Sequence, residues 1–204
     1  MAIQPVEQIE YVQSNELTLP AQGQWTYDDY RRLPEDGWRY EVFQGELHMT
    51  PAPGTDHQRS STRLERQLSN FVVEHDLGEV LHAPLDVRLG KLANPVQPDI
   101  LFIRQDRLDI IQERWIEGAP DLIVEILSPG NWIDDRRTKY RLYALAGVRE
   151  YWIVDPRKCE IDVYVLREGS FMQVGNFGAG ERVRSDVLAG FEIGVDEICV
   201  KRPE

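Results

Sequence analysis

The sequence is poor in cysteine and histidine, and it has no long apolar run. Its two cysteines, Cys159 and Cys199, form no CxxC pattern, so they require no disulfide framework, and with the four histidines they show no zinc-ligand spacing. No stretch approaches the roughly 18 consecutive apolar residues of a transmembrane helix. Residues 1–20 lack the basic start and apolar stretch of a secretory signal. We therefore expect a cytoplasmic protein with no membrane partner.

Two enzyme motifs are also missing. There is no Gly-x-Ser-x-Gly turn, so the sequence does not favour a serine hydrolase. The glycine-rich stretch from Gly175 to Gly180 lacks the Lys-Ser/Thr pair and the following helix of a phosphate-binding loop. We expect that stretch to be a plain loop.

Basic residues are fewer than acidic residues. The chain has 23 Lys and Arg against 35 Asp and Glu, a net charge of −12, which argues against general coating of nucleic acid through its phosphates. A nuclease remains compatible with this balance, because divalent cations in an acidic site can attract a phosphate. Arg136, Arg137, Lys139 and Arg141 form one local basic patch, whose simpler interpretation is a solvated helix face.

The length and composition fit one folded domain. The chain has 204 residues, 42% of them hydrophobic and 28% charged, which suits a single globular core. Residues 1–24 are polar and without periodicity, so we interpret them as an N-terminal arm. Residues 25–204 contain no linker or repeat and are interpreted as one domain.

Apolar periodicity and turn residues divide this domain into helices and strands. Their order predicts an α/β fold in which helices flank a mixed central sheet. Helices are expected at 27–33, capped by Thr26, at 56–75 and at 134–146; strands at 85–89, 99–103, 121–127 and 151–155; and hairpins at 40–49 and 161–174.

Two acids interrupt the most apolar strands. Glu125 stands within an otherwise apolar run, and Asp99 opens another directly after Pro98. A carboxylate among apolar neighbours loses hydration, which costs several kcal/mol unless a counter-charge or metal compensates. A hard divalent cation would compensate both acids. The simpler alternative is a surface Asp at a strand end and a Glu paired with a buried arginine.

Pro98-Asp99 followed by Glu125 resembles the "PD" and "(D/E)" elements of the PD-(D/E)XK nuclease superfamily. The wider set of motifs, from about Tyr27 to the C-terminus, resembles the Uma-two family of restriction-like endonucleases. That set comprises Tyr40-Glu41 before Gly45-Glu46-Leu47, His57, Gln97-Pro98-Asp99-Ile100, Val124-Glu125-Ile126-Leu127-Ser128-Pro129, Lys139-Tyr140, and Gly147-Val148 before Glu150-Tyr151-Trp152-Ile153-Val154-Asp155.

One position departs from the superfamily pattern. A lysine is expected two residues after the second acid, where this chain has Leu127. The family resemblance implies that Lys139, on the following helix, takes over that role. A helix packed beside the strand end can aim an ammonium group at the same site. The alternative is an ordinary surface lysine.

The resemblance implies a restriction-endonuclease-like fold and metal-dependent hydrolysis of DNA phosphodiester bonds. Asp99 and Glu125 would hold Mg²⁺, with Mn²⁺ as a substitute, and Lys139 would stabilise developing charge. Glu41 is the candidate for a further acidic ligand and catalytic residue. The candidate substrate contacts are His57, Arg136 and Tyr140, although His57 also suits a solvated helix start and Tyr140 suits core packing.

Three further alternatives stay open. The chain could be a non-catalytic binding or interaction module that keeps the nuclease fold, as its acidic charge and the missing in-strand lysine favour. It could also act on RNA. A homodimer would let two sites cut two strands.

Overall fold

The computed structural model describes residues 19–128 and 132–199, and at residues 132–136 it describes the backbone alone. The described chain folds into α-helices and β-strands, with one 3₁₀ helix. In order they are α1 (Tyr27–Tyr30), β1 (Arg39–Phe43), β2 (Glu46–Thr50), α2 (Thr55–Glu74), β3 (Gly78–His82), β4 (Asp86–Arg88), β5 (Ile100–Arg104), η1 (Gln105–Ile110), β6 (Trp115–Glu117), β7 (Leu122–Ile126), α3 (Trp132–Ala146), β8 (Glu150–Asp155), β9 (Glu160–Arg167), β10 (Ser170–Phe177), β11 (Arg182–Arg184), β12 (Glu192–Gly194) and α4 (Val195–Ile198).

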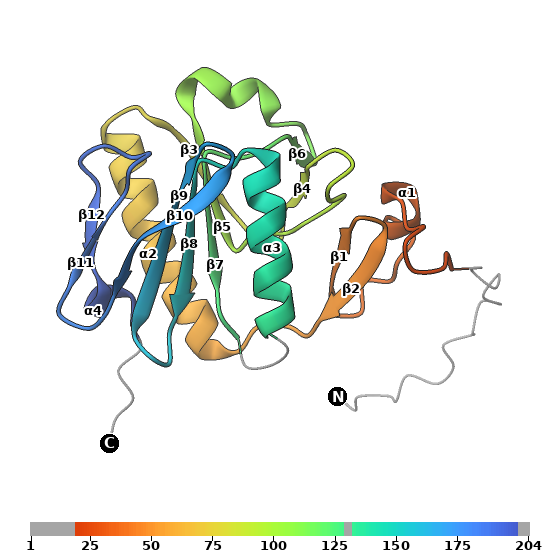
Figure 1. The fold of residues 1–204 in the computed structure, drawn as a ribbon, viewed down its shortest axis with the longest axis horizontal. Helices are drawn as coiled ribbons and strands as arrows, with labels where there is room; N and C mark the ends of the chain where they lie inside the picture. The colour runs from red at the N-terminus through yellow and green to blue at the C-terminus, as the bar shows by residue number, and fades with distance from the viewer. Residues whose placement is uncertain (1–18, 129–131, 200–204) are drawn as a thin grey trace, which may run out of the picture.

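The centre of the fold is a six-stranded mixed sheet with the strand order β10-β9-β8-β7-β5-β3. Strands β7 and β8 are parallel, and the other neighbouring strands are antiparallel. Helix α3 connects the parallel pair, as a parallel crossover requires. Figure 1 shows the sheet between α2 and α3, which confirms the predicted mixed sheet flanked by helices.

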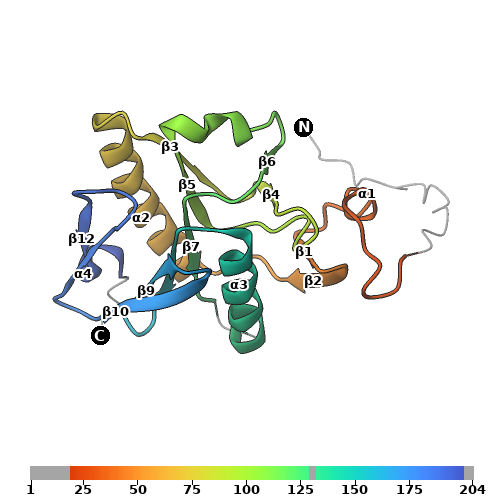
Figure 2. The same ribbon diagram turned by 45° about the horizontal axis from the view of Figure 1, so that its top comes forward.

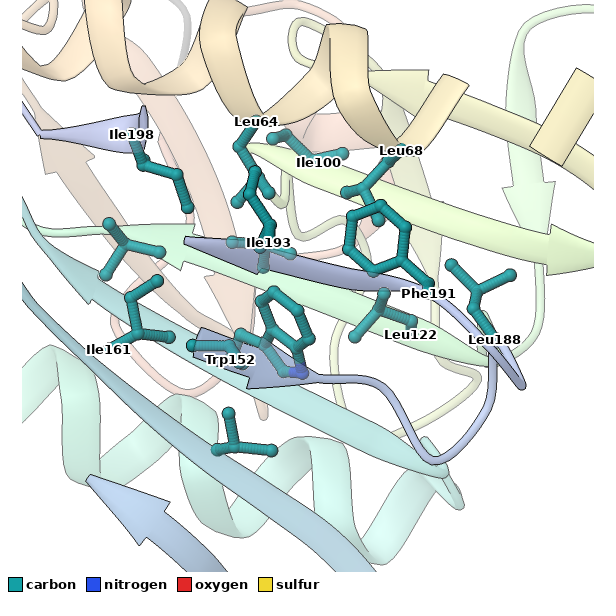
Figure 3. Packing of buried hydrophobic residues seen from close by; sticks show 14 of the residues in the cluster. Leu64, Leu68, Ile100, Leu122, Trp152, Ile161, Leu188, Phe191, Ile193 and Ile198 are labelled. Carbon is teal, nitrogen blue, oxygen red and sulfur yellow. The ribbon is translucent and has the colours of Figure 1, made fainter. Parts of the chain in front are cut away.

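Helix α2 covers one face of the sheet. Its buried residues Leu64, Leu68 and Val72 recur at helical spacing and are at most 1% exposed. They pack against sheet residues such as Ile100, Leu122 and Trp152, together with Phe191 and Ile193 from the C-terminal segment. Figure 3 shows these side chains meeting between the helix and the strands.

Helix α3 and the segment 85–97 cover the other face. Leu142 and Tyr143 of α3 pack with Ile123 and Tyr151 of the sheet. The β1–β2 hairpin lies beyond α3, on the side away from α4, β11 and β12 (Figures 1 and 2). Strand β1 is joined to the loop before β5 by backbone bonds from the Val42 amide to the Pro95 carbonyl and from the Asn94 amide to the Val42 carbonyl, 2.8 and 2.9 Å long.

Several short elements were not predicted, and two expectations, the plain loop at residues 175–180 and the lack of a disulfide, were wrong. Strands β6, β11 and β12 are three residues long and β3 is five, too short for their own sequences to identify them, so only their partners reveal them. The glycine-rich stretch is not all loop, because β10 continues to Phe177 after a bulge between Gln173 and Gly175. The two cysteines form a disulfide. Its halves are 40 residues apart in sequence, so only the fold brings them together.

The arm predicted for residues 1–24 lies mostly outside the described residues. At its end, the Gly23 amide donates to the Gly45 carbonyl in the hairpin turn, over 2.8 Å. The division into an arm and one domain stays a prediction. Among the described residues, no helix has both the length and the apolar character needed to cross a membrane.

The packing of α2 gives a first test of the fold. Leu68→Ala should lower the free energy of unfolding by about 2 to 5 kcal/mol, because it leaves a cavity under the helix. Val73→Ala, on the outer face of the same helix where Val73 is 77% exposed, should change it little. Urea unfolding of both variants measures the difference, and equal losses would contradict the assigned faces of α2.

Candidate active site

The two acids singled out in the sequence lie on neighbouring strands. In the antiparallel pair β5–β7, Ile100 lies opposite Val124. Continuing this register by one residue places Asp99, just before β5, opposite Glu125. Both side chains are nearly buried, with 3% and 8% of their surface exposed. The sheet itself therefore brings two carboxylates together at one strand end.

Asp99 is held by three donors from different parts of the fold. Arg39 Nη1 lies 3.0 Å from Oδ1, His57 Nε2 lies 2.9 Å from Oδ2, and the Ile126 amide donates to Oδ2 over 2.8 Å. Burial tends to raise the pKa of Asp99. The hydrogen bond from His57 and the charge of Arg39 outweigh it and lower that pKa to about 2. Asp99 is therefore a carboxylate at neutral pH.

Lys139 joins the other two acids. Its Nζ lies 3.0 Å from Glu41 Oε2 and 3.1 Å from Glu125 Oε1, and the lysine is only 3% exposed. Glu41 comes from β1, and its Oε1 accepts the Gln97 amide over 2.7 Å. The hairpin, β7 and α3 thus each contribute one charged group to a buried triad.

Tyr143 lies one helical turn after Lys139 and reaches the same glutamate. Its hydroxyl donates to Glu125 Oε1 over 2.7 Å. Burial, followed by the negative charges of Glu125 and Glu41, raises the pKa of Tyr143 well above its ordinary value. The phenol therefore stays protonated and remains a donor that holds Glu125 in place.

The chemistry of this donor set fits a hard divalent cation. Glu41, Asp99 and Glu125 offer carboxylate oxygens, which Mg²⁺ prefers. Among these side chains and the cations Arg39 and Lys139, three negative charges face two positive ones. Within the described part of the chain, however, no three His, Cys, Asp or Glu side chains are arranged to hold a metal ion. Cationic side chains occupy the carboxylates instead, so an incoming ion has to exchange with them.

A groove of about 660 Å³ opens beside Asp99. The start of α2, the residues before β1 and the segment 82–84 form its walls. His57 lines it, and among the described residues no group bonds the buried Nδ1 of this histidine. The groove therefore connects solvent with the Asp99 end of the site.

Comparison with known proteins identifies the family of this chain. Residues 27–196 match the sequence model of the Uma2 family, whose description reads "Putative restriction endonuclease". The chain belongs to this family. The match confirms the resemblance that the motifs had indicated.

Two individual proteins are similar to the chain. "Uncharacterized protein slr1290" of Synechocystis sp. is 27% identical over 161 residues, which cover 78% of this chain and 83% of that protein. A crystal structure from Anabaena variabilis, described as "a putative nuclease belonging to DUF820", superposes with a TM-score of 0.71. It covers 85% of this chain and 97% of that chain at 19% identity, a level that shows a shared fold alone.

The site unites most of the residues predicted from the sequence. Lys139 contacts Glu41 and Glu125, and His57 contacts Asp99, which lies opposite Glu125 on the neighbouring strand. Their catalytic and metal-binding roles stay predictions.

The remaining predicted substrate contacts, Tyr140 and Arg136, and the departing position Leu127 lie outside this group of contacts or outside the described side chains. Tyr140 is turned to the core, where its hydroxyl donates to the Phe171 carbonyl over 2.7 Å. The side chain of Arg136 lies outside the described residues. Leu127, at the usual lysine position, packs against the α3 side of the core.

The sequence interpretation missed Arg39. Its signal was available, because Arg39 and Glu41 are two residues apart on one strand and therefore point to the same side. What the sequence did not show is that β1 lies beside the start of β5. Tyr143 was not among the predicted site residues, although its spacing of four residues from Lys139 puts both on one helix face.

The low pKa of Asp99 predicts a dependence of stability on pH. Because the pKa is lower in the folded protein than in the unfolded chain, the carboxylate stabilises the fold above pH about 4, and this contribution disappears as the pH falls toward about 2. Wild type should thus lose on the order of 2 kcal/mol more unfolding free energy than Asp99→Asn over that interval. Urea unfolding at a series of pH values measures this. Parallel curves for the two proteins would contradict it.

Proposed function

We propose that this chain is a metal-dependent endonuclease that hydrolyses phosphodiester bonds of DNA, with Mg²⁺ as the cofactor and Mn²⁺ as a substitute. One observation carries the proposal: three buried carboxylates, from β1, β7 and the residue before β5, lie beside two cations, with Lys139 of α3 paired to Glu41 and Glu125 and Arg39 of β1 paired to Asp99. Burial of so many ionised groups is costly, and a site that handles metal and phosphate is a functional reason to retain them. Membership of the Uma2 family supports the same chemistry.

In this proposal Glu41, Asp99 and Glu125 hold the cation. Bound Mg²⁺ supplies Lewis-acid chemistry, which polarises the phosphoryl group and makes water a usable nucleophile at neutral pH. Arg39, His57 and the Ile126 amide fix the orientation of Asp99. Tyr143 and the Gln97 amide do the same for Glu125 and Glu41. The carboxylates are therefore positioned before any ligand arrives, which avoids reorganisation during reaction.

Lys139 supplies the positive charge that the superfamily pattern places two residues after the second acid. Its ammonium group has three donors. With two carboxylates already within 3.1 Å, it lies where it can donate to a phosphate oxygen or to the attacking water. Such a donor lowers the barrier because it meets charge that develops in the transition state.

A non-catalytic binding module is the second candidate, and a specific observation favours it. Lys139 is already paired with Glu41 and Glu125, and Arg39 is already paired with Asp99. A site in which each carboxylate has a cationic partner does not need a metal for its stability and could serve only to preserve the fold. Metal binding and turnover, measured separately, distinguish the two functions. Action on RNA, a homodimer and the cytoplasmic location stay predictions.

Plasmid nicking tests the catalytic proposal. The purified protein should nick supercoiled DNA with Mg²⁺ or Mn²⁺ and stop when a chelator is added. Asp99→Asn and Glu125→Gln should each reduce the rate at least about 100-fold, because each removes a negatively charged ligand. Gel electrophoresis of the plasmid forms measures the rate.

Asp109→Asn is the matched control, since Asp109 is an exposed acid outside the site. This variant should nick the plasmid at the wild-type rate. Cleavage that persists in Asp99→Asn, or that ignores the chelator, would rule out the proposed site. A folded protein that binds Mg²⁺ but cuts neither DNA nor RNA would favour the binding module.

Lys139→Met separates metal binding from catalysis. Without the ammonium, the buried carboxylates of Glu41 and Glu125 lose their ion pairs with Lys139, so the free energy of unfolding should fall by about 3 to 5 kcal/mol. Mg²⁺ should restore stability, because it no longer competes with Lys139, and it should raise the Tm more than in wild type. Cleavage should be lost.

Thermal melts and calorimetric titration with and without Mg²⁺ measure these effects. Arg141→Met removes the same charge from an exposed position on α3 and should leave both properties unchanged. If Mg²⁺ bound wild type and Lys139→Met equally, the cation would not replace the lysine at these carboxylates.

A further inference from the structure

An exposed tryptophan stands at the groove beside Asp99. Trp38 lines this groove and has 48% of its surface exposed. Among the strongly exposed large apolar side chains of the described residues, it is the only aromatic one. It directly precedes Arg39, whose guanidinium group lies 3.0 Å from Asp99. The position of Trp38 is therefore tied to the catalytic carboxylate.

The backbone around Trp38 is held in place although the residue is exposed. Asp36 Oδ1 accepts the Trp38 amide over 3.1 Å, and Asp36 Oδ2 accepts the Tyr40 hydroxyl over 2.8 Å. Tyr40 is 9% exposed and belongs to β1, so the clamp ties this short segment to the hairpin. An aromatic ring presented on a fixed backbone binds a flat ligand with little loss of conformational freedom.

The charge of the groove selects the part of a nucleic acid that fits inside. Arg39 is the only Lys or Arg among the described residues that line it, and this arginine is already paired with Asp99. The wall formed by α2 contributes Gln58, Ser61 and Thr62, which are neutral hydrogen-bonding groups, and Glu65. A row of phosphates would find few cations here. A base, which is uncharged and has hydrogen-bonding edges, matches this lining.

We propose that the groove binds one unpaired nucleotide of single-stranded DNA, with its base stacked on Trp38 and its phosphate at the Asp99 end. This inference rests on the proposed nuclease function and names its substrate class. Stacking on an aromatic ring tolerates any base, because every base has a π-face. In a duplex both faces of each base are covered by neighbouring bases, so the ring has no free face to stack on. The chain therefore prefers single strands, overhangs or frayed ends to intact duplex.

Equilibrium binding in the presence of chelator tests the inference without cleavage. The probes are fluorescently labelled oligonucleotides of one sequence, single-stranded or in a blunt duplex, and anisotropy reports binding. Wild type should bind the single strand at least about tenfold more tightly than the duplex. Trp38→Ala should weaken single-strand binding by about 5- to 150-fold, which is the range for loss of one stacked base.

Two variants serve as controls. Trp38→Phe keeps an aromatic face and should retain most of the affinity. Val73→Ala removes an exposed apolar group from the outer face of α2 and should bind like wild type. Because Trp38 is exposed, Trp38→Ala should melt near the wild-type Tm, so a loss of binding reports contact with the ligand.

The outcomes separate this inference from the proposed function. Equal affinity for both probes, or full single-strand binding by Trp38→Ala, overturns the inference. If metal-dependent cleavage persists in that case, the nuclease proposal stands without it. If binding depends on Trp38 and Mg²⁺ produces no cleavage of either probe, the proposed catalysis fails while the inferred ligand stands. Faster cleavage of the single strand, reduced in kcat/KM by Trp38→Ala, supports both.

Discussion

The burial of three carboxylates beside two cations is the constraint on which the rest of the site depends. Removing ionised groups from water costs several kcal/mol each, and the cost is offset only when each charge meets a partner of good geometry. Lys139 lies between Glu41 and Glu125, and Arg39 lies against Asp99. If one of these cations moved, a negative charge would be left buried without its partner. The site is therefore held in one arrangement by the penalty for breaking it.

This constraint explains how the periphery is attached to the central sheet. The β1–β2 hairpin is not part of that sheet, yet it supplies Arg39 and Glu41. Backbone bonds from Val42 to the segment before β5 fix the hairpin, and Arg39 and Glu41, two residues apart on β1, then point to the same side and reach the site. Helix α3 is fixed by Tyr143 and Leu142 in the core, which places Lys139 beside the strand end. The backbone bonds of the hairpin and the apolar packing of α3 thus hold Arg39, Glu41 and Lys139 in place, although burial of these charged groups is itself unfavourable.

The same ion pairs bear on both candidate functions. A catalytic site needs its carboxylates oriented before metal arrives, and the hydrogen bonds to Asp99, Glu41 and Glu125 provide that order. A binding module needs only that each buried carboxylate has a cationic partner, and Lys139 and Arg39 provide these partners. The exposed ring of Trp38 at the groove is not needed to pair the buried carboxylates with cations. Its backbone is nevertheless held by Asp36, which accepts the Trp38 amide and the Tyr40 hydroxyl.

The sequence alone determined the long elements and most of the charged site. Helix α2 has strong apolar periodicity, the buried strands β5, β7 and β8 are continuous apolar runs, and helix α3 has acidic residues at its start and Gly147 after its end, so local rules suffice to find them. Asp99 and Glu125 were found because an acid in an apolar strand is an energetic anomaly visible without coordinates. The ordered motifs extended this to Glu41, His57 and Lys139.

Only the tertiary structure decided which of these groups meet, and what surrounds them. Arg39 against Asp99, Trp38 at the groove and the bond between Cys159 and Cys199 join segments that are distant in sequence. The short strands β3, β6, β11 and β12 likewise exist through their partners. Local propensity is a property of neighbouring residues, whereas burial and ion pairing depend on contacts across the fold. For that reason the sequence predicted the acids, and the packing alone showed that two cations already hold them.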